Sequence, residues 1–140
     1  MTNRGNLMPL VRLPSNRSAP KGHIFVERDA LIRVTPIKGD QAIRVNLSAP
    51  DSPSKGRTVA TTAPLADLLT LLGPHVQVQL VNAHQTDEEY SYVRRDRIAC
   101  IVPTAIDDGR LRLLLANGEE ISVVNEGDIA SLLTTAHAVS

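Results

Sequence analysis

Alternating polar and apolar residues, many of them β-branched, occur in several short stretches of the chain and predict half-buried β-strands. The clearest of these stretches are residues 42–47, 57–61, 110–115 and 120–124. Asn117-Gly118 joins the last two, and both residues tolerate the positive φ of a tight hairpin turn. The polar residues 48–56 replace that turn in the first half, and a surface loop absorbs such an insertion at small entropic cost. The pattern therefore predicts a β-hairpin before the end of each half.

The stretch VERDALIRVTP at residues 26–36 returns as VRRDRIACIVP at residues 93–103, an offset of 67 positions. Extended backwards, the same offset aligns residues 10–36 with residues 77–103 without a gap. The identical pairs in this alignment are Val11/Val78, Leu13/Leu80, Val26/Val93, Arg28/Arg95, Asp29/Asp96 and Pro36/Pro103. The conservative pairs expected in the core are Phe25/Tyr92, Leu31/Ile98 and Val34/Ile101. We predict a mainly β (β+α) fold, a tandem duplication of a small ββββα unit with pseudo-twofold symmetry.

Each copy ends in a leucine-rich stretch that predicts one short helix. Thr62 is expected to cap the first helix, with Pro64 near its start and Gly73-Pro74 ending it. Asn125 is expected to cap the second helix, which carries acids in its first turn where the helix dipole favours them. The apolar faces expected to pack on the core are Leu65, Leu68, Leu69 and Leu72 in the first helix and Ile129, Leu132 and Leu133 in the second.

The repeat sets the expected organisation of the chain. An N-terminal arm covers residues 1–9, repeat unit 1 residues 10–73, repeat unit 2 residues 74–136, and a tail residues 137–140. A unit of about 60 residues buries little surface alone, so we expect the two units to pack as one compact domain. Residues 1–73 hold ten Lys/Arg and five acids, giving +5, whereas residues 74–140 hold five Arg and ten acids, giving −5. This asymmetry is either ordinary surface scatter or a dipole that favours head-to-tail contact between copies.

Composition excludes several classes of protein. Aromatic residues make up 2% of the chain, which all but excludes stacking platforms for single-stranded nucleic acid. Cys100 is the single cysteine, which rules out an internal disulfide, and its apolar neighbours predict a buried side chain. No stretch approaches the roughly 18 apolar residues that span a bilayer, and the N-terminus lacks the apolar core of a signal peptide. We expect a soluble protein made in the cytoplasm, with no membrane partner.

The chain shows no constellation for catalysis. Its four histidines are not spaced as a metal-binding pair, and nucleotide-binding and nucleophile motifs are absent. The acidic pairs Glu88-Glu89, Asp107-Asp108 and Glu119-Glu120 fall at predicted turns, where solvated acids are normal. We therefore predict a protein that is not an enzyme and uses no cofactor or metal ion.

Charged residues supply the candidate contact sites. Those assigned to contact with other proteins are Arg4, Arg12, Arg17, Lys21, Glu88 and Glu89. The run RRDR at residues 94–97 is compatible with phosphate binding. Part of it recurs in the first copy, which favours a repeated turn device made of Arg28, Asp29, Arg95 and Asp96. Because the chain is neutral and its basic arm lacks aromatic residues, we expect no nucleic-acid partner.

The second copy resembles small flagellar proteins of the FlbD type over residues 76–133. The shared positions are Tyr92-Val93, Asp96, Ile98, Ile101, Pro103, Leu113, Asn117-Gly118, Ile121, Val123, Glu126, Ile129 and Leu132. The first copy, residues 10–69, matches less well because its hairpin turn is interrupted. The resemblance implies a short sheet plus a helix, no enzymatic activity, and a role in flagellar assembly or its regulation.

Three hypotheses about function remain open from the sequence. The first is a non-enzymatic structural protein that self-associates and docks on a larger assembly, such as a capsid decoration or cement protein of a tailed-phage virion. The second is a small regulatory binding module of the flagellar type. The third is a small enzyme, which would need a pocket with converging polar groups. The duplicated β unit, the opposed charges and the missing catalytic constellation favour the first.

Overall fold

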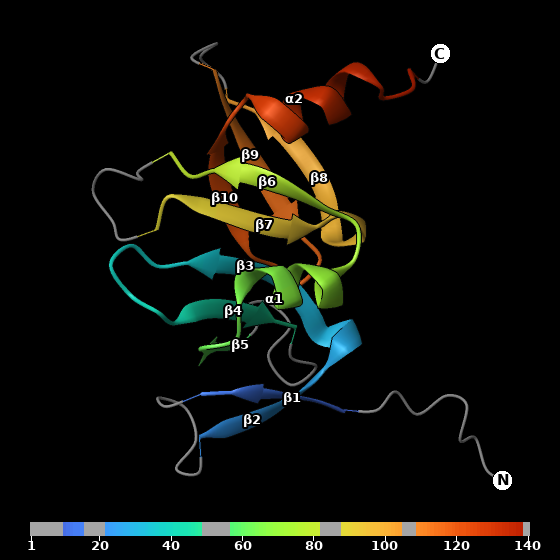
Figure 1. Ribbon diagram of the computed structural model, residues 1–140. Helices are drawn as coiled ribbons and strands as arrows, with labels where there is room; N and C mark the ends of the chain where they lie inside the picture. The colour runs from blue at the N-terminus through green and yellow to red at the C-terminus, as the bar shows by residue number, and fades with distance from the viewer. Residues whose placement is uncertain (1–9, 16–21, 49–56, 82–87, 105–108, 139–140) are drawn as a thin grey trace, which may run out of the picture.

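The computed structural model describes residues 10–15, 22–48, 57–81, 88–104 and 109–138. As the hydrophobic pattern predicts, the described chain is mainly β (Figure 1). The first half contains β1 (Leu10–Pro14), β2 (His23–Glu27), the 3-10 turn η2 (Arg28–Ala30), β3 (Leu31–Pro36), β4 (Ile43–Leu47), β5 (Arg57–Thr61) and α1 (Leu65–Leu72). The second half contains β6 (His75–Gln79), β7 (Tyr90–Arg94), the 3-10 turn η3 (Arg95–Arg97), β8 (Ile98–Pro103), β9 (Arg110–Leu115), β10 (Glu120–Val124) and α2 (Gly127–Thr134).

The described strands pair antiparallel in three sheets. One sheet has the order β5-β4-β3-β7-β6, a second has the order β10-β9-β8, and β1 pairs with β2 in a hairpin. The two halves of the chain join where β3 pairs with β7, with Arg33 opposite Val93 and Val34 opposite Tyr92. In Figure 1 the sheets form a stack, with the β1–β2 hairpin at one end and α2 at the other. The five-stranded sheet therefore contains strands from both halves.

Two apolar clusters form the core. The buried members of the first are Leu13, Val26, Leu31, Val34, Ile43, Val45, Ala63, Leu68 and Leu72. The buried members of the second are Ile32, Val76, Val78, Val93, Leu111, Leu113, Leu115, Ile121, Val123 and Ile129. Helix α1 packs on β3 and α2 packs on β6, each burying part of its apolar face. Ile32 comes from the first half but packs in the second cluster, so β3 fixes the halves to each other.

The described part of each half contains five strands where the sequence predicted four. The turn η2 connects β2, in the hairpin, to β3, in the five-stranded sheet, and η3 connects β7 to β8 in the same way. Because each turn moves the chain from one sheet to another, residues 23–36 and 90–103 each form two strands separated by a turn. Both following strands carry a bulge at aligned positions, between Leu31 and Arg33 and between Ile98 and Cys100.

The predicted helix caps were wrong, but the predicted end of the first helix is confirmed. The N-caps are Pro64 and Glu126, and neither side chain forms a capping hydrogen bond. Gly73 ends α1 with a φ of 79°, and its N–H donates to the Leu69 carbonyl at 3.1 Å. The hairpin turn predicted at Asn117-Gly118 is also present, with Gly118 at a φ of 86°.

Three residues predicted in the core are exposed. Cys100 is exposed on β8, and Phe25 is 62% exposed on β2. Among the described strands each of these two has one neighbour, so a side chain there has less sheet around it than in a central strand. Leu133, the third, lies outside the buried face of α2. The apolar pattern identified the strands, but it does not say which strand lies at an edge.

A buried arginine connects the five-stranded sheet to the β9–β10 turn. Arg33 on β3 donates from Nε to Glu119 Oε1 at 3.0 Å and from Nη2 to Oε2 at 2.6 Å. Its Nη1 donates to Thr35 Oγ1 and Ser91 Oγ, both at 3.0 Å. These four hydrogen bonds satisfy most of the guanidinium donors, which is what a buried charge requires.

Across the ranges given above, no helix has both the length and the apolar character needed to cross a membrane.

Candidate functional site

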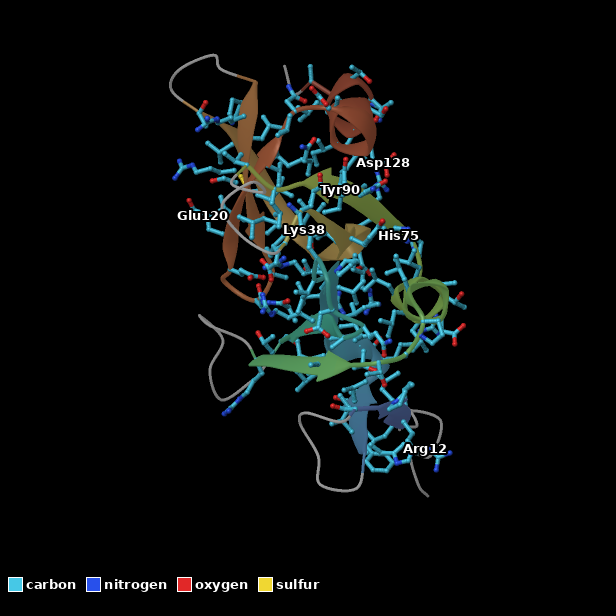
Figure 2. All side chains as sticks on the ribbon, turned by 60° about the vertical axis from the view of Figure 1, so that its left-hand side comes forward. Arg12, Lys38, His75, Tyr90, Glu120 and Asp128 are labelled. Atoms are coloured by element: carbon cyan, nitrogen blue, oxygen red, sulfur yellow. The ribbon has the colours of Figure 1, made fainter. Side chains whose placement is uncertain are left out.

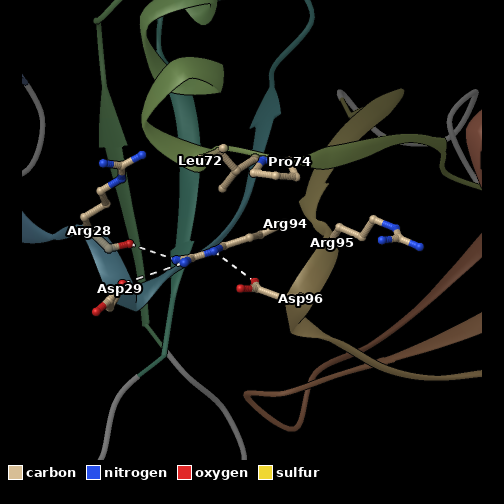
Figure 3. Close-up of a pocket in the computed structure, with 8 residues that line it drawn as sticks. Arg28, Asp29, Leu72, Pro74, Arg94, Arg95 and Asp96 are labelled. Atoms are coloured by element: carbon tan, nitrogen blue, oxygen red, sulfur yellow. Dashed lines mark hydrogen bonds and ion pairs between the residues drawn. The ribbon is translucent and has the colours of Figure 1, made fainter.

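The two 3-10 turns face each other across a cleft of about 450 Å³ (Figure 3). Turn η2 and turn η3 line it together with residues 72–74, which follow the end of α1. We call this hollow the arginine cleft. Arg28, Arg94 and Arg95 line it, and Arg97 lies beside it on turn η3. The fold thus brings together the two turn sequences, which are 67 residues apart in the chain.

Arg94 connects the two turns. Its Nη1 donates to the Arg28 carbonyl at 3.2 Å, and its Nη2 lies 3.7 Å from the Asp29 carboxylate. Its Nε lies 3.0 Å from Asp96 Oδ1, so one guanidinium reaches both turns. The side chain is only 15% exposed. Arg94 therefore acts first as a structural connection and presents little of its charge to a ligand.

Arg97 supports the same arrangement. Its Nη2 donates to the Asp29 carbonyl at 2.9 Å, and its Nη1 lies 3.6 Å from Asp96 Oδ1. Both cleft aspartates thus have an arginine beside them, which partly offsets the negative charge that they bring to the cleft.

Arg28 and Arg95 keep donors for a ligand. Arg28 donates from Nε to the Leu71 carbonyl at 3.0 Å, which fixes the side chain beside the end of α1. Its two Nη groups, and the whole Arg95 guanidinium, form no hydrogen bond or ion pair with any residue that the structure describes. The Arg95 backbone is held, since its N–H donates to the Pro74 carbonyl at 2.9 Å. Two exposed guanidinium groups on a fixed backbone are suited to an oxyanion such as phosphate.

The other predicted contact residues are not brought together with the cleft. Arg12 is exposed on β1 and points outward from the hairpin (Figure 2). Glu88 forms an ion pair with Arg44, and Glu89 is half-buried, with its backbone carbonyl accepting from the Leu80 N–H at 2.9 Å. Arg4, Arg17, Lys21 and the pair Asp107-Asp108 lie outside the described residues. In the described part of the chain no three metal-ligating side chains form a group.

The sequence contained one signal for the arginine cleft. The Arg-Asp pair recurs at the same offset as the repeat, which assigned it to a turn in each copy. The two turns meet because β3 pairs with β7. No local pattern in the sequence indicates this pairing between the halves.

No family model matches the chain, and no curated protein matches it. The described architecture, with its antiparallel sheets and two short helices, is nevertheless similar to that of a solved structure. The similar structure is a LytTr DNA-binding domain, from a protein described as a methyl-accepting/DNA response regulator of Bacillus cereus. The likeness has a TM-score of 0.52 at 18% sequence identity and covers 91% of this chain and 94% of that chain. It therefore extends over both halves and concerns the fold.

This likeness corrects the predicted relationship. The resemblance to FlbD-type flagellar proteins was wrong, because the chain shares its fold with a LytTr domain over nearly its whole length. Most positions behind that resemblance are core and turn residues, which many hairpin-and-helix structures require.

The likeness also corrects the predicted function and partners. The interpretations as a virion component such as a capsid decoration protein, and as a flagellar module, were wrong. The expectation of no nucleic-acid partner was wrong as well, since the similar structure is a DNA-binding domain. That expectation rested on the neutral net charge and on the lack of aromatic residues in the basic arm. Net charge does not show how folding gathers four arginines near one cleft.

Proposed function

We propose that the protein binds DNA through the arginine cleft, and that it acts by binding and not by catalysis. The observation that carries the proposal is the pair of exposed guanidinium groups, Arg28 and Arg95, on turns that face one cleft. They occur on a fold shared with a DNA-binding domain. A cytoplasmic location, where DNA is accessible, is part of the same proposal.

In this proposal Arg28 and Arg95 donate to backbone phosphates. A guanidinium presents paired N–H donors that match phosphate oxygens, and such charge-assisted hydrogen bonds are stronger than neutral ones. Arg94 and Arg97 are positioning residues, because their donors already hold the two turns together. The four arginines and two aspartates of this site sum to +2, from four positive and two negative charges. The site is thus locally basic although the chain is neutral.

Contacts of this kind position a protein on a duplex without reading its sequence. Because each phosphate contact releases counterions, we expect binding that weakens steeply with salt. Single-stranded binding is disfavoured, since the chain has few aromatic side chains on which bases could stack.

We further propose that the two halves are copies of one unit, as the repeat in the sequence predicts. In support, β2, η2 and β3 span residues 23–36, and β7, η3 and β8 span residues 90–103, the same offset of 67 throughout. Both halves also have the same order of five strands, a 3-10 turn and a final helix. In this view Arg28 and Arg95 are equivalent residues, one from each copy. Superposition of an experimental structure of one half on the other tests the duplication directly.

The DNA proposal is tested by fluorescence anisotropy with a labelled duplex at low salt. We expect Arg28→Ala and Arg95→Ala each to weaken binding about tenfold, because each removes a charged hydrogen bond worth roughly 1.5 kcal/mol or more. Arg12→Ala is the matched control, since Arg12 is exposed on β1 outside the cleft. If wild-type protein does not bind duplex, or if Arg12→Ala weakens binding as much as Arg95→Ala, the assignment of this site is wrong.

A further inference from the structure

Strands β3 and β8 occupy the same place in the two halves but have different neighbours. β3 lies between β4 and β7, whereas β8 pairs with β9 alone among the described strands. In the other aligned pair of strands, β2 and β7, the strand of the second half has the two neighbours. β7 pairs with both β6 and β3, whereas β2 pairs with β1 alone in the same part of the chain. Among the described strands, the contact between the halves is therefore made once, by β3 and β7. The corresponding edges of β2 and β8 carry no described strand.

The burial of side chains follows this difference. From Leu31 to Thr35 every residue of β3 is buried, and Ile32 is 0% exposed. In β8 the aligned residues are half-buried or exposed, and Ala99, which aligns with Ile32, is exposed. Phe25 on β2 is 62% exposed, while the aligned Tyr92 packs against the first apolar cluster. An apolar strand with an open edge is a site where another strand adds by backbone pairing.

The pairing of β3 with β7 indicates which strand would add to β8. In that pairing Val34 lies opposite Tyr92. Moving each residue by the repeat offset of 67 places Ile101 opposite Phe25. Both side chains have exposed apolar surface in the single chain, and both would lose it in such a pair. Ala99 would enter the apolar cluster of the neighbouring first half, as Ile32 enters the second cluster here.

We propose that β8 of one copy pairs with β2 of a second copy, in the arrangement that joins β3 to β7 within the chain. The proposal rests on the two halves being equivalent, and it is independent of DNA binding and of the net charge of each half. The contact is heterologous, because the two strands are different, so it leaves one β2 edge and one β8 edge open after each addition. Association of this kind adds further copies, into an open chain or a closed ring, instead of stopping at a symmetric dimer.

The test uses one blocking variant for each edge. Ala99→Lys places an ammonium group where the aligned Ile32 is fully buried, and Phe25→Lys places one where the aligned Tyr92 packs against the first apolar cluster. Both side chains are exposed in the single chain, so both variants are expected to fold, which circular dichroism checks. Thr58→Lys is the control, because Thr58 is exposed on β5, at another sheet edge that takes no part in the proposed pairing. Sedimentation velocity without DNA and under reducing conditions excludes DNA bridging and disulfides through Cys100.

We expect wild-type protein and Thr58→Lys to sediment as increasingly large species as concentration rises. Ala99→Lys and Phe25→Lys should each remain monomeric. Their equimolar mixture should form a heterodimer and nothing larger, because the first variant keeps its β2 edge and the second keeps its β8 edge. Wild-type protein that stays monomeric up to its solubility limit overturns the proposal. So does association that survives either blocking variant alone, that is lost in Thr58→Lys, or that the mixture fails to restore.

Discussion

Removing Glu119 should leave a positive charge buried without its partner. Arg33 donates two hydrogen bonds to the Glu119 carboxylate, at 3.0 and 2.6 Å, and the two side chains are 8% and 21% exposed. In Glu119→Ala the guanidinium keeps only the Thr35 and Ser91 hydroxyl groups as acceptors. Breaking a fully buried ion pair by removing one partner costs about 3–5 kcal/mol. Because water can reach the partly exposed position of Glu119, we expect about 3 kcal/mol, at the lower end of that range.

A double variant separates the lost pair from the unpaired charge. Arg33→Met in the Glu119→Ala background removes the charge and keeps an apolar side chain of similar length. Thr35 Oγ1 and Ser91 Oγ lie 2.9 Å apart, so the two hydroxyl groups still satisfy each other. We therefore expect the double variant to be more stable than Glu119→Ala alone, by about 1 kcal/mol or more.

Urea unfolding at neutral pH, followed by circular dichroism, measures both free energies. A free energy of unfolding for Glu119→Ala within about 0.5 kcal/mol of the wild-type value, the range of an ordinary surface change, would contradict the prediction. A double variant less stable than Glu119→Ala would also contradict it, since the cost would then not arise from the unpaired guanidinium.

Three further predictions concern the turn after α1, the free thiol and the arginine cleft. Gly73→Ala should lower the free energy of unfolding by about 1–3 kcal/mol, because a φ of 79° with a ψ of −148° is a conformation that only glycine adopts readily. The added Cβ would meet no atom within 4 Å, so this cost arises from the backbone conformation alone, and a smaller loss in urea unfolding would contradict it. Cys100 should react with a thiol reagent in the native monomer at close to the rate of the unfolded chain, and strong protection would contradict its exposure on β8. Arg94→Met should weaken DNA binding while leaving its salt dependence close to that of wild type, because Arg94 positions the turns; a salt dependence reduced as in Arg95→Ala would instead make Arg94 a phosphate contact.

The sequence predicted where the strands lie along the chain better than it predicted which strands pair with each other. The strand predicted at residues 110–115 and the one at 120–124 are β9 and β10 with the same bounds, because alternation and the Asn117-Gly118 turn are local properties. Cys100 was wrongly placed in the core for the opposite reason. Its burial depends on whether another strand lies beside β8, and an apolar run reads the same in a central strand and at an edge.

The candidate site shows the same limit. The repeated Arg-Asp pair was recognised as a turn in each copy, and the two turns are η2 and η3. That they line one cleft follows from β3 pairing with β7, a contact between residues about 60 positions apart in the sequence. Whole-chain charge concealed the site, because acids on other surfaces cancel the arginines that the fold gathers.

The salt dependence of duplex binding tests the DNA-binding account most directly. Each phosphate neutralised by an arginine contributes about 0.9 to the slope of log K against log salt concentration. We predict that the Arg28→Ala/Arg95→Ala variant binds more weakly than wild type with a slope shallower by about 1.8, while Arg12→Ala keeps the wild-type slope. An unchanged slope in the double variant would show that these two guanidinium groups do not contact phosphates and would contradict the account.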